Sequence, residues 1–508
     1  MFTIELLESR IAPAAVFVNA TTATYTDTDG DLVTVKFTKP VLSASNVADV
    51  LETASTGAGD QLEKIDLTQA LNPAGTGLTI TAKPSADAGD GFASVGYIDA
   101  LGIDLGAVKI HGDLGRIDAG DSNTATLGLK SLAAASIGLF GSSTQAAGGN
   151  DQSNVTAGIG PITITTDWSF ASLTVTGGKG SIGAISVGDS MLGVTLSASG
   201  AIGAVAVKGS IDGLTLTAAS VGAETVGADF NGNIINTTGN AGAIKIGGSA
   251  NNLTLSVDAL AGFTLGHDLT SASITTTNLA KSGLKIGGEV DRSNLTVNGP
   301  SEIVSIAGSM NQTMISASTL TSLSIGGSVE GGLIGANTLA KLTIGGNFDG
   351  SGALGAAVID VASIGTAVIH GSVFGGASSG SGLISAENIS SLTIGGDLEG
   401  GDNPGSGAVM DTGEIEGFTL GKITIGGSIV SGANDGTGTL VRSGTILSES
   451  TIKSIVVHGS LSGNSSSNGV TPVIISAAGP DDSAAKTDVA IKSLTIGGSV
   501  SLTNILAG

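Results

Sequence analysis

The chain has 508 residues, of which 43 are acidic and 20 are basic, so its formal net charge is −23. This charge argues against nucleic acid as a partner, because nucleic acids are bound through lysine and arginine that neutralise phosphates, and equally against anionic membrane surfaces. Cysteine is absent, which excludes a disulfide framework or a thiolate site, and apolar runs stay well short of the roughly 18 residues of a membrane helix, so we expect no direct membrane insertion.

The first part of the chain differs from the rest and predicts a small β-rich cap over residues 1–97. Residues 14–37 predict a hairpin, because two strand-like runs flank the turn signal Asp29-Gly30. Residues 46–51 predict a helical turn, and residues 78–81 predict another strand. We expect this cap to cover one end of the architecture that follows, since an uncovered end exposes strand edges.

A phrase that returns about every 20 residues dominates the remainder, as in Leu323-Ser-Ile-Gly-Gly-Ser-Val329 and Leu342-Thr-Ile-Gly-Gly-Asn-Phe348. The apolar residue before the glycine turn serves as a ruler, and from Val187 to Ile344 its steps are 19 to 21 residues. The phrase is strand-like, and a single coil cannot bury its own apolar face, whereas stacked coils can. The sequence therefore predicts an all-β protein in which residues 98–508 form a right-handed parallel β-helix of about 17 coils.

Each coil should hold at least two short strands and a third short segment, such as that at Ile202 or Leu320. We also count a degenerate copy of the ruler at Ile137. Later steps lengthen, and the extra residues have loop compositions, for example at 399–407 and 463–469. We interpret them as insertions on a conserved coil.

Three segments carry a family resemblance: Leu7-Glu-Ser-Arg10, the hairpin Tyr25-Thr-Asp-Thr-Asp-Gly-Asp-Leu-Val-Thr-Val35, and Val95-Gly-Tyr-Ile-Asp-Ala-Leu-Gly-Ile-Asp-Leu-Gly-Ala-Val-Lys-Ile110. They resemble the large β-solenoid surface repeat proteins of planctomycete–verrucomicrobial bacteria, which often begin with a Leu-Glu-Pro-Arg-type signature. Ser9 stands in place of that proline. The resemblance implies an extracellular or cell-surface location, although the start of the chain does not read as a conventional signal peptide. It implies little about activity.

Asp27, Asp29 and Asp31 have the alternate spacing that opens a calcium loop. An EF-hand would continue with glycine at its sixth position and glutamate at its twelfth, and here these are Leu32 and Thr38. The alternative interpretation is a polar hairpin turn. We assign no metal ligand, and calcium binding at these three residues stays open.

Five aspartates crowd the first coils: Asp99, Asp104, Asp113, Asp118 and Asp121. Carboxylates on adjacent coils could bind calcium, as they do in pectate-lyase-like β-helices, and that enzyme class also needs a basic residue beside the metal. Lys109 and Arg116 are nearby in the sequence. The competing interpretation is that these are solvated turn residues, which we favour.

The four histidines and the single tryptophan do not predict a site. His111, His370 and His458 occupy the first glycine position of the phrase and His267 lies one place further, so they are variants at a turn. Trp168 occupies the apolar position after the turn and is expected to pack rather than to bind sugar. We therefore predict no catalytic residue and no cofactor.

Small or polar residues recur after the glycine pair and would form a ladder along one edge of the stacked coils: Ser249, Ser309, Ser328, Asn347, Ser372, Asp397, Ser428, Ser460 and Ser499. The alternative is ordinary turn chemistry.

We expect a non-enzymatic structural or adhesive solenoid of the cell surface, with a polysaccharide-active, pectate-lyase-like enzyme as the alternative. A surface polysaccharide is a candidate partner. The last coil should also promote end-to-end association into fibres through Leu502 and Ile505, because a bare coil end is a template for another strand layer.

Overall fold

The structure is a computed structural model that describes residues 15–56, 59–85, 89–352, 355–480 and 489–508. The chain is 59% strand and 2% helix and forms a parallel β-solenoid of about 13 turns, which confirms the all-β prediction. The chain divides into two compact units, residues 1–242 and residues 243–508. The Leu7–Arg10 signature lies outside the described residues.

The first unit opens with an antiparallel sheet. Strand β2 pairs with β1 on one side and with β3 on the other, and β3 also pairs with β6. The predicted hairpin is therefore confirmed, and Gly30 in its turn has a φ of 101°, which favours glycine. The predicted helical turn is α1. The elements of this region are β1 (Val16–Asn19), β2 (Thr22–Thr26), β3 (Leu32–Phe37), α1 (Val47–Val50), β4 (Leu51–Thr56), β5 (Gly59–Asp66), the 3-10 helix η1 (Leu67–Gln69) and β6 (Leu78–Lys83).

The first parallel strands of the solenoid pair directly with strands of this N-terminal region. Strand β6 pairs in parallel with β8 (Leu105–Gly120), and β5 pairs in parallel with β7 (Val95–Leu101). The predicted division between residues 97 and 98 falls inside β7, so the cap strands and the first coils share one sheet. The next elements are β9 (Leu129–Ile137), the 3-10 helix η2 (Gly141–Thr144) and β10 (Gln152–Thr156).

Regular coils follow in the first unit, and each contains three short strands, as expected. Strands with ruler residues are β11 (Ile162–Ile164), β14 (Ile185–Val187), β18 (Val205–Val207) and β22 (Glu224–Val226). Strands directly after the turn are β12 (Trp168–Ser169), β15 (Met191–Leu192), β19 (Ile211–Asp212) and β23 (Phe230–Asn231). The third set is β13 (Ser172–Thr176), β16 (Thr195–Ala198), β20 (Thr215–Ala218) and β24 (Ile234–Thr237), with short β17 (Ala201–Ile202) and β21 (Ser220–Val221).

One detail of the predicted register is wrong. Ile164 pairs with Ala134, so Ala134 is the ruler residue of that coil, and Ile137 instead pairs with Trp168 after the turn. Because alanine is small, this copy of the phrase does not match a pattern of large apolar residues. The coil count is about 13, slightly fewer than the predicted count of about 17.

The second unit has the same coil with longer strands, and β25 (Ala241–Ile246) spans the division point. Long strands are β27 (Thr254–Leu265), β29 (Ser273–Leu279), β32 (Asn294–Ile306), β33 (Met310–Ile325), β34 (Val329–Ile344), β36 (Ala357–Ile369), β38 (Leu383–Ile394), β40 (Val409–Ile425) and β42 (Leu440–Val457). Short strands after the turn are β26 (Ala250–Asn251), β28 (Leu269–Thr270), β31 (Val290–Asp291), β35 (Phe348–Asp349), β37 (Val373–Phe374), β39 (Leu398–Glu399), β41 (Ile429–Val430), β43 (Leu461–Ser462) and β48 (Val500–Ser501). The others are β30 (Leu284–Ile286), β44 (Asn464–Ser466), β45 (Gly469–Thr471), β46 (Val473–Ala477), β47 (Leu494–Ile496) and β49 (Thr503–Ala507).

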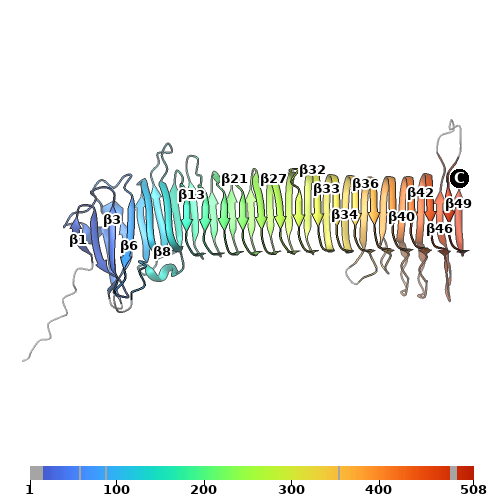
Figure 1. Ribbon diagram of the computed structural model, residues 1–508, viewed down its shortest axis with the longest axis horizontal. Helices are drawn as coiled ribbons and strands as arrows, with labels where there is room; N and C mark the ends of the chain where they lie inside the picture. Colours follow the sequence, from blue (N-terminus) through green and yellow to red (C-terminus); the bar gives the residue numbers. More distant parts are fainter. Residues whose placement is uncertain (1–14, 57–58, 86–88, 353–354, 481–488) are drawn as a thin grey trace, which may run out of the picture. The chain divides into compact units, whose positions relative to one another are not determined.

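The core of this unit is a stack of ruler residues, and β32, β33, β34 and β36 follow one another side by side (Figure 1). Ile325 pairs with Ile344 and both side chains are fully buried, as predicted. Glycine recurs at the turn because backbones of adjacent coils touch there: a Cβ on Gly345 would lie 2.1 Å from the carbonyl oxygen of Gly326. At Gly345 any side chain would therefore require the backbone to shift.

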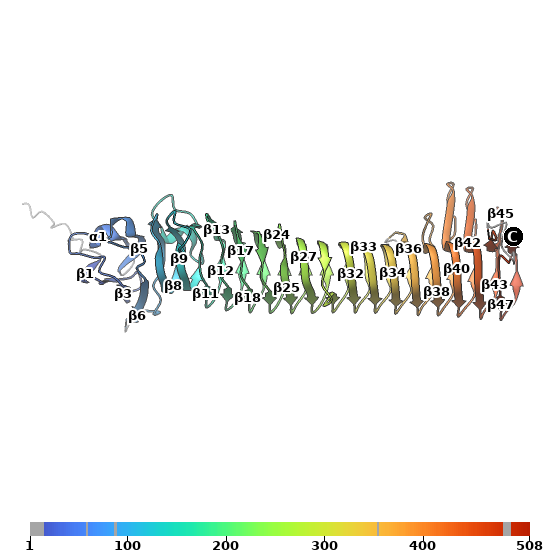
Figure 2. The ribbon, with the colours of Figure 1, turned by 90° about the horizontal axis from the view of Figure 1, so that it is seen from above.

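The predicted insertions lie within coils of the second unit, after the short strands β39 and β43, and loops project near β40 and β42 (Figure 2). They are ordered on one another, since the N–H of Ala433 donates to Asp402 and the amide of Asn403 donates to the carbonyl of Thr439. The insertion at 463–469 is not simply a loop, because β44 and β45 pair there as a small antiparallel hairpin.

Candidate functional site

A cavity of about 520 Å³ lies in the first unit, where the turn after β2 meets β5, residues 90–94 and η2. Five carboxylates line it, together with three aromatic rings and several small polar residues. Among the described residues around this cavity there is no lysine or arginine. Its carboxylates and rings are Asp27, Asp29, Asp60, Asp90, Asp113, Tyr25, Phe92 and Phe140.

Asp31 holds together two of the segments next to this cavity. Its side chain is fully buried, Oδ1 accepts the N–H of Ser85 at 2.7 Å, and Oδ2 accepts the N–H of Gly91 at 2.7 Å. One carboxylate thus ties the β2–β3 hairpin to a segment more than 50 residues later in the chain. Its orientation is set by backbone donors and not by a basic side chain.

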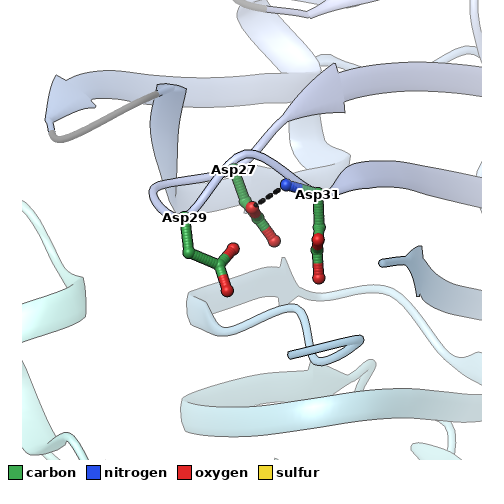
Figure 3. A group of neighbouring side chains, drawn as sticks. All are labelled: Asp27, Asp29 and Asp31. Atoms are coloured by element: carbon green, nitrogen blue, oxygen red, sulfur yellow. Dashed lines mark hydrogen bonds between the residues drawn. The ribbon is translucent and has the colours of Figure 1, made fainter. Parts of the chain in front are cut away.

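Asp27 and Asp29 lie beside Asp31 in the same turn (Figure 3). Asp27 is 7% exposed, and its Oδ1 accepts the N–H of Asp31 at 2.7 Å. Asp29 is half-buried, and its Oδ2 accepts the N–H of Asp90 at 3.1 Å. One oxygen from each of the three carboxylates lies within 4.8 Å of the others. The turn therefore gathers three anionic groups in one place.

Burial and like charge act on these groups in different ways. Burial, followed by interaction with the Asp29 carboxyl, raises the pKa of Asp27 to about 7. The pKa of Asp29 is lowered, mainly by its hydrogen bond with the Asp27 carboxyl. Burial, and then the charges of Asp27 and Asp60, raise the pKa of Tyr25 far above its usual range. The Tyr25 ring is 2% exposed, and in the described part of the chain its hydroxyl has no hydrogen-bond partner.

The sequence identified the three aspartates but not the features that make them a site. From the sequence, Tyr25 predicted only a strand. Ser85, Asp90 and Gly91 are distant from the three aspartates in the chain. The one available signal for Tyr25 was its alternation with Asp27, because residues two apart on a strand share a face.

The five aspartates of the first coils do not form one cluster, although Asp99 pairs with Asp118 on adjacent strands. Asp113 accepts from the Ser136 hydroxyl at 2.6 Å and from the N–H groups of Leu139 and Phe140. Asp99 pairs with Lys64 at 3.2 Å. Asp104 accepts from Thr126 and from the N–H of Asp121.

Arg116 is engaged as well. Its guanidinium lies 2.7 Å from Asp118 and stacks over the Tyr97 ring at 3.9 Å, while the Tyr97 hydroxyl donates to Asp118 at 2.8 Å. Lys109 is exposed on β8. Arg116, Asp118 and Tyr97 thus contact one another, which is not the arrangement of a free base beside a metal, and the buried Nε of Arg116 has no hydrogen-bond partner among the described residues.

Trp168 and three of the histidines are placed as the repeat predicted, and His267, His370 and His458 are exposed turn residues. The prediction is wrong for His111, which is exposed but lies within β8, where its ring stacks on Phe92 with centroids 4.7 Å apart. Trp168 is buried and pairs with Met191 in the next coil. Over the described residues, the only metal-competent group of three or more side chains is Asp27, Asp29 and Asp31.

The ladder after the glycine pair is a series of hydrogen bonds. In the second unit each side-chain oxygen accepts the backbone N–H of the equivalent residue one coil later, at 2.6–3.2 Å from Ser309 to Ser499. The first unit repeats the pattern, since Ser210 donates its N–H to the Ser190 hydroxyl at 3.2 Å. The serine, asparagine and aspartate side chains are thus used to join coils.

Two buried glutamates were not predicted. Glu224 in β22 pairs with Val205, is 1% exposed, and has no hydrogen-bond partner among the described residues. Burial raises its pKa to about 8. Glu414 in β40 is fully buried 3.7 Å from Arg442, and burial outweighs that cation and raises its pKa to about 8.

The last coil exposes apolar side chains that earlier coils bury. Ile505 is 45% exposed, whereas Ile475, its partner in the preceding coil, is fully buried. Leu502 is 45% exposed, Val500 is 53% exposed and Leu506 is 55% exposed.

This chain matches no protein family, no curated protein and no solved structure. Within its described residues, no helix has both the length and the apolar character needed to span a membrane.

Proposed function

We propose that this chain is a non-enzymatic β-solenoid with a structural or adhesive role at the cell surface. The observation that carries the proposal is the hydrogen-bond ladder from Ser309 to Ser499. Its polar side chains could have presented chemistry to a ligand. Instead they satisfy the backbone of the next coil and add directional bonds to a stack held by apolar burial.

The state of the acidic first coils supports the same conclusion. A lyase of the pectate type needs an unengaged base beside its metal. Arg116 is bound to Asp118 and covered by Tyr97, and Asp113 accepts three hydrogen bonds from its own coil neighbours. A surface location rests on the resemblance to large bacterial surface repeat proteins.

Turnover assays test the proposal directly. The full chain is incubated with a panel of neutral and acidic polysaccharides in the presence of calcium, and the release of new chain ends is measured. We expect none. Turnover that disappears in Arg116→Ala or Lys109→Ala, and persists in the exposed control Lys130→Ala, would overturn the proposal in favour of a polysaccharide-active enzyme.

The last coil supports self-association as part of this role. Val500 in β48 and Ile505 in β49 are half-exposed, whereas their partners Leu461 and Ile475 are fully buried. Leu502 lies between these two strands and is also half-exposed. An apolar β layer of this kind is completed by another strand layer. We take a second copy of the chain as that layer, in a head-to-tail arrangement that extends into fibres.

A further inference from the structure

The three carboxylates of the turn after β2 are oriented before any ligand arrives. Asp27 is held by the N–H of Asp31, Asp29 by the N–H of Asp90, and Asp31 by two further backbone N–H groups. Each carboxylate oxygen has a second lone pair, so these bonds leave capacity for a cation. Hydrogen bonds from backbone donors therefore position the oxygens without neutralising their charge.

The spacing of these oxygens fits a large hard cation. Calcium binds oxygen at about 2.3–2.6 Å, so oxygens around one calcium ion lie up to about 5 Å apart. The oxygens here lie within 4.8 Å of one another. Magnesium demands near-ideal octahedral geometry at about 2.0–2.1 Å and usually keeps several waters with only one or two carboxylates, so three grouped carboxylates favour calcium.

Charge around the cluster is uncompensated. None of the ion pairs formed by the described residues includes Asp27, Asp29 or Asp31. The adjoining cavity adds the carboxylates of Asp60 and Asp90 and no described basic side chain. Grouped carboxylates without a cation repel one another, and this cost falls when a cation binds.

An independent observation points to a ligand in the same space. Tyr25 lines the same cavity, and its hydroxyl is buried and has no partner among the described residues. Tyr25 precedes Asp27 by two residues, and both residues line this cavity. Buried polar groups are normally satisfied, and an orphan hydroxyl calls for a missing partner.

We propose that Asp27, Asp29 and Asp31 bind one calcium ion, with the Tyr25 hydroxyl as a further oxygen ligand or as the partner of a water molecule on the ion. The inference goes beyond the structural role proposed above and does not depend on it. The ion would lie between the β2–β3 hairpin and the segment that contains Ser85, Asp90 and Gly91. Calcium would thereby stabilise the start of the solenoid.

Calorimetric titration of the chelator-treated full chain with calcium chloride tests the site. The key variant is Asp27→Asn combined with Asp29→Asn, because each amide oxygen can still accept the backbone N–H that holds it. The matched control is Asp60→Asn, which removes a carboxylate from the same cavity but not from the cluster. Circular dichroism of each calcium-free protein checks that the fold is kept.

We expect one saturable calcium site, an increase in thermal unfolding temperature on binding, and weaker binding of magnesium. The double variant should lose at least about tenfold in calcium affinity, equivalent to about 1.4 kcal/mol, while Asp60→Asn loses much less. Absence of saturable calcium binding to the unmodified chain would overturn the proposal. So would equal affinity in the double variant, or an equal loss in Asp60→Asn. These outcomes leave the turnover assay unaffected, so the two proposals fail separately.

Discussion

Oδ1 of Asp397 accepts the backbone N–H of Ser428 at 2.6 Å, across one coil boundary of the second unit. The N–H of Asp397 itself donates to the Ser372 hydroxyl at 3.0 Å. Each ladder residue is thus an acceptor for one neighbour through its side chain and a donor to the other through its backbone. The bonds link consecutive coils into a chain of contacts along the turn.

This relationship predicts the effect of removing a single acceptor. Asp397→Ala leaves the N–H of Ser428 without its partner in a half-buried turn, so we expect a loss of about 1 kcal/mol in the free energy of unfolding. Asp397→Asn keeps an oxygen at the same place and should lose much less. Urea unfolding of the two variants measures the difference. Equal stability of the alanine variant and the unmodified chain would contradict a stabilising ladder.

The core stack predicts a larger effect. Ile325 is fully buried against Ile344, so Ile325→Asp places a carboxylate in an aliphatic stack, and we expect a loss of about 3–5 kcal/mol. Ser324→Asp is the matched control, since Ser324 is half-buried and alternates with Ile325 on β33. Denaturant unfolding checks both. A small loss in the Ile325 variant would mean that the stack does not hold the coil.

Most of the fold can be predicted from the recurring phrase. Residues such as Ile325 and Ile344 set the register, because a fixed period of apolar residues can be buried only by stacking. The phrase failed at Ala134, where the ruler residue is small. The phrase also does not predict Glu224, a charged residue at an apolar position. Asp27, Asp29 and Asp31 could be found as neighbours in the sequence.

The surroundings of those aspartates could not be predicted in the same way. The N–H groups of Ser85 and Gly91 reach Asp31 only because the chain returns to the hairpin after more than 50 residues. No local pattern records such a contact.

Glu224 predicts a pH dependence of stability. The carboxyl ionises near pH 4.5 when exposed, whereas burial raises its pKa in the folded chain to about 8. Between these values the folded state binds one proton more than the unfolded state. Stability should therefore fall as pH rises from 4.5 to 8, by up to about 1.4 kcal/mol per pH unit from this group.

Glu224→Gln isolates that contribution, because the amide has a similar shape and does not titrate. We expect the stability of the Gln variant to decline less between pH 5 and pH 8 than that of the unmodified chain, as measured by urea unfolding at several pH values. The exposed control Glu289→Gln should leave the profile unchanged. Parallel profiles for the Glu224 variant and the unmodified chain would refute the assignment.

Exposed apolar residues of the last coil predict concentration-dependent association. Leu502→Lys combined with Ile505→Lys introduces one charge into β49 and one between β48 and β49, and a second strand layer could not cover them without desolvation. Sedimentation velocity over a wide concentration range should show larger species for the unmodified chain and a marked shift towards monomer for the double variant. The control Leu192→Lys changes an exposed apolar residue in the first unit. A strictly monomeric unmodified chain would refute the proposal, and so would assemblies that persist in the double variant.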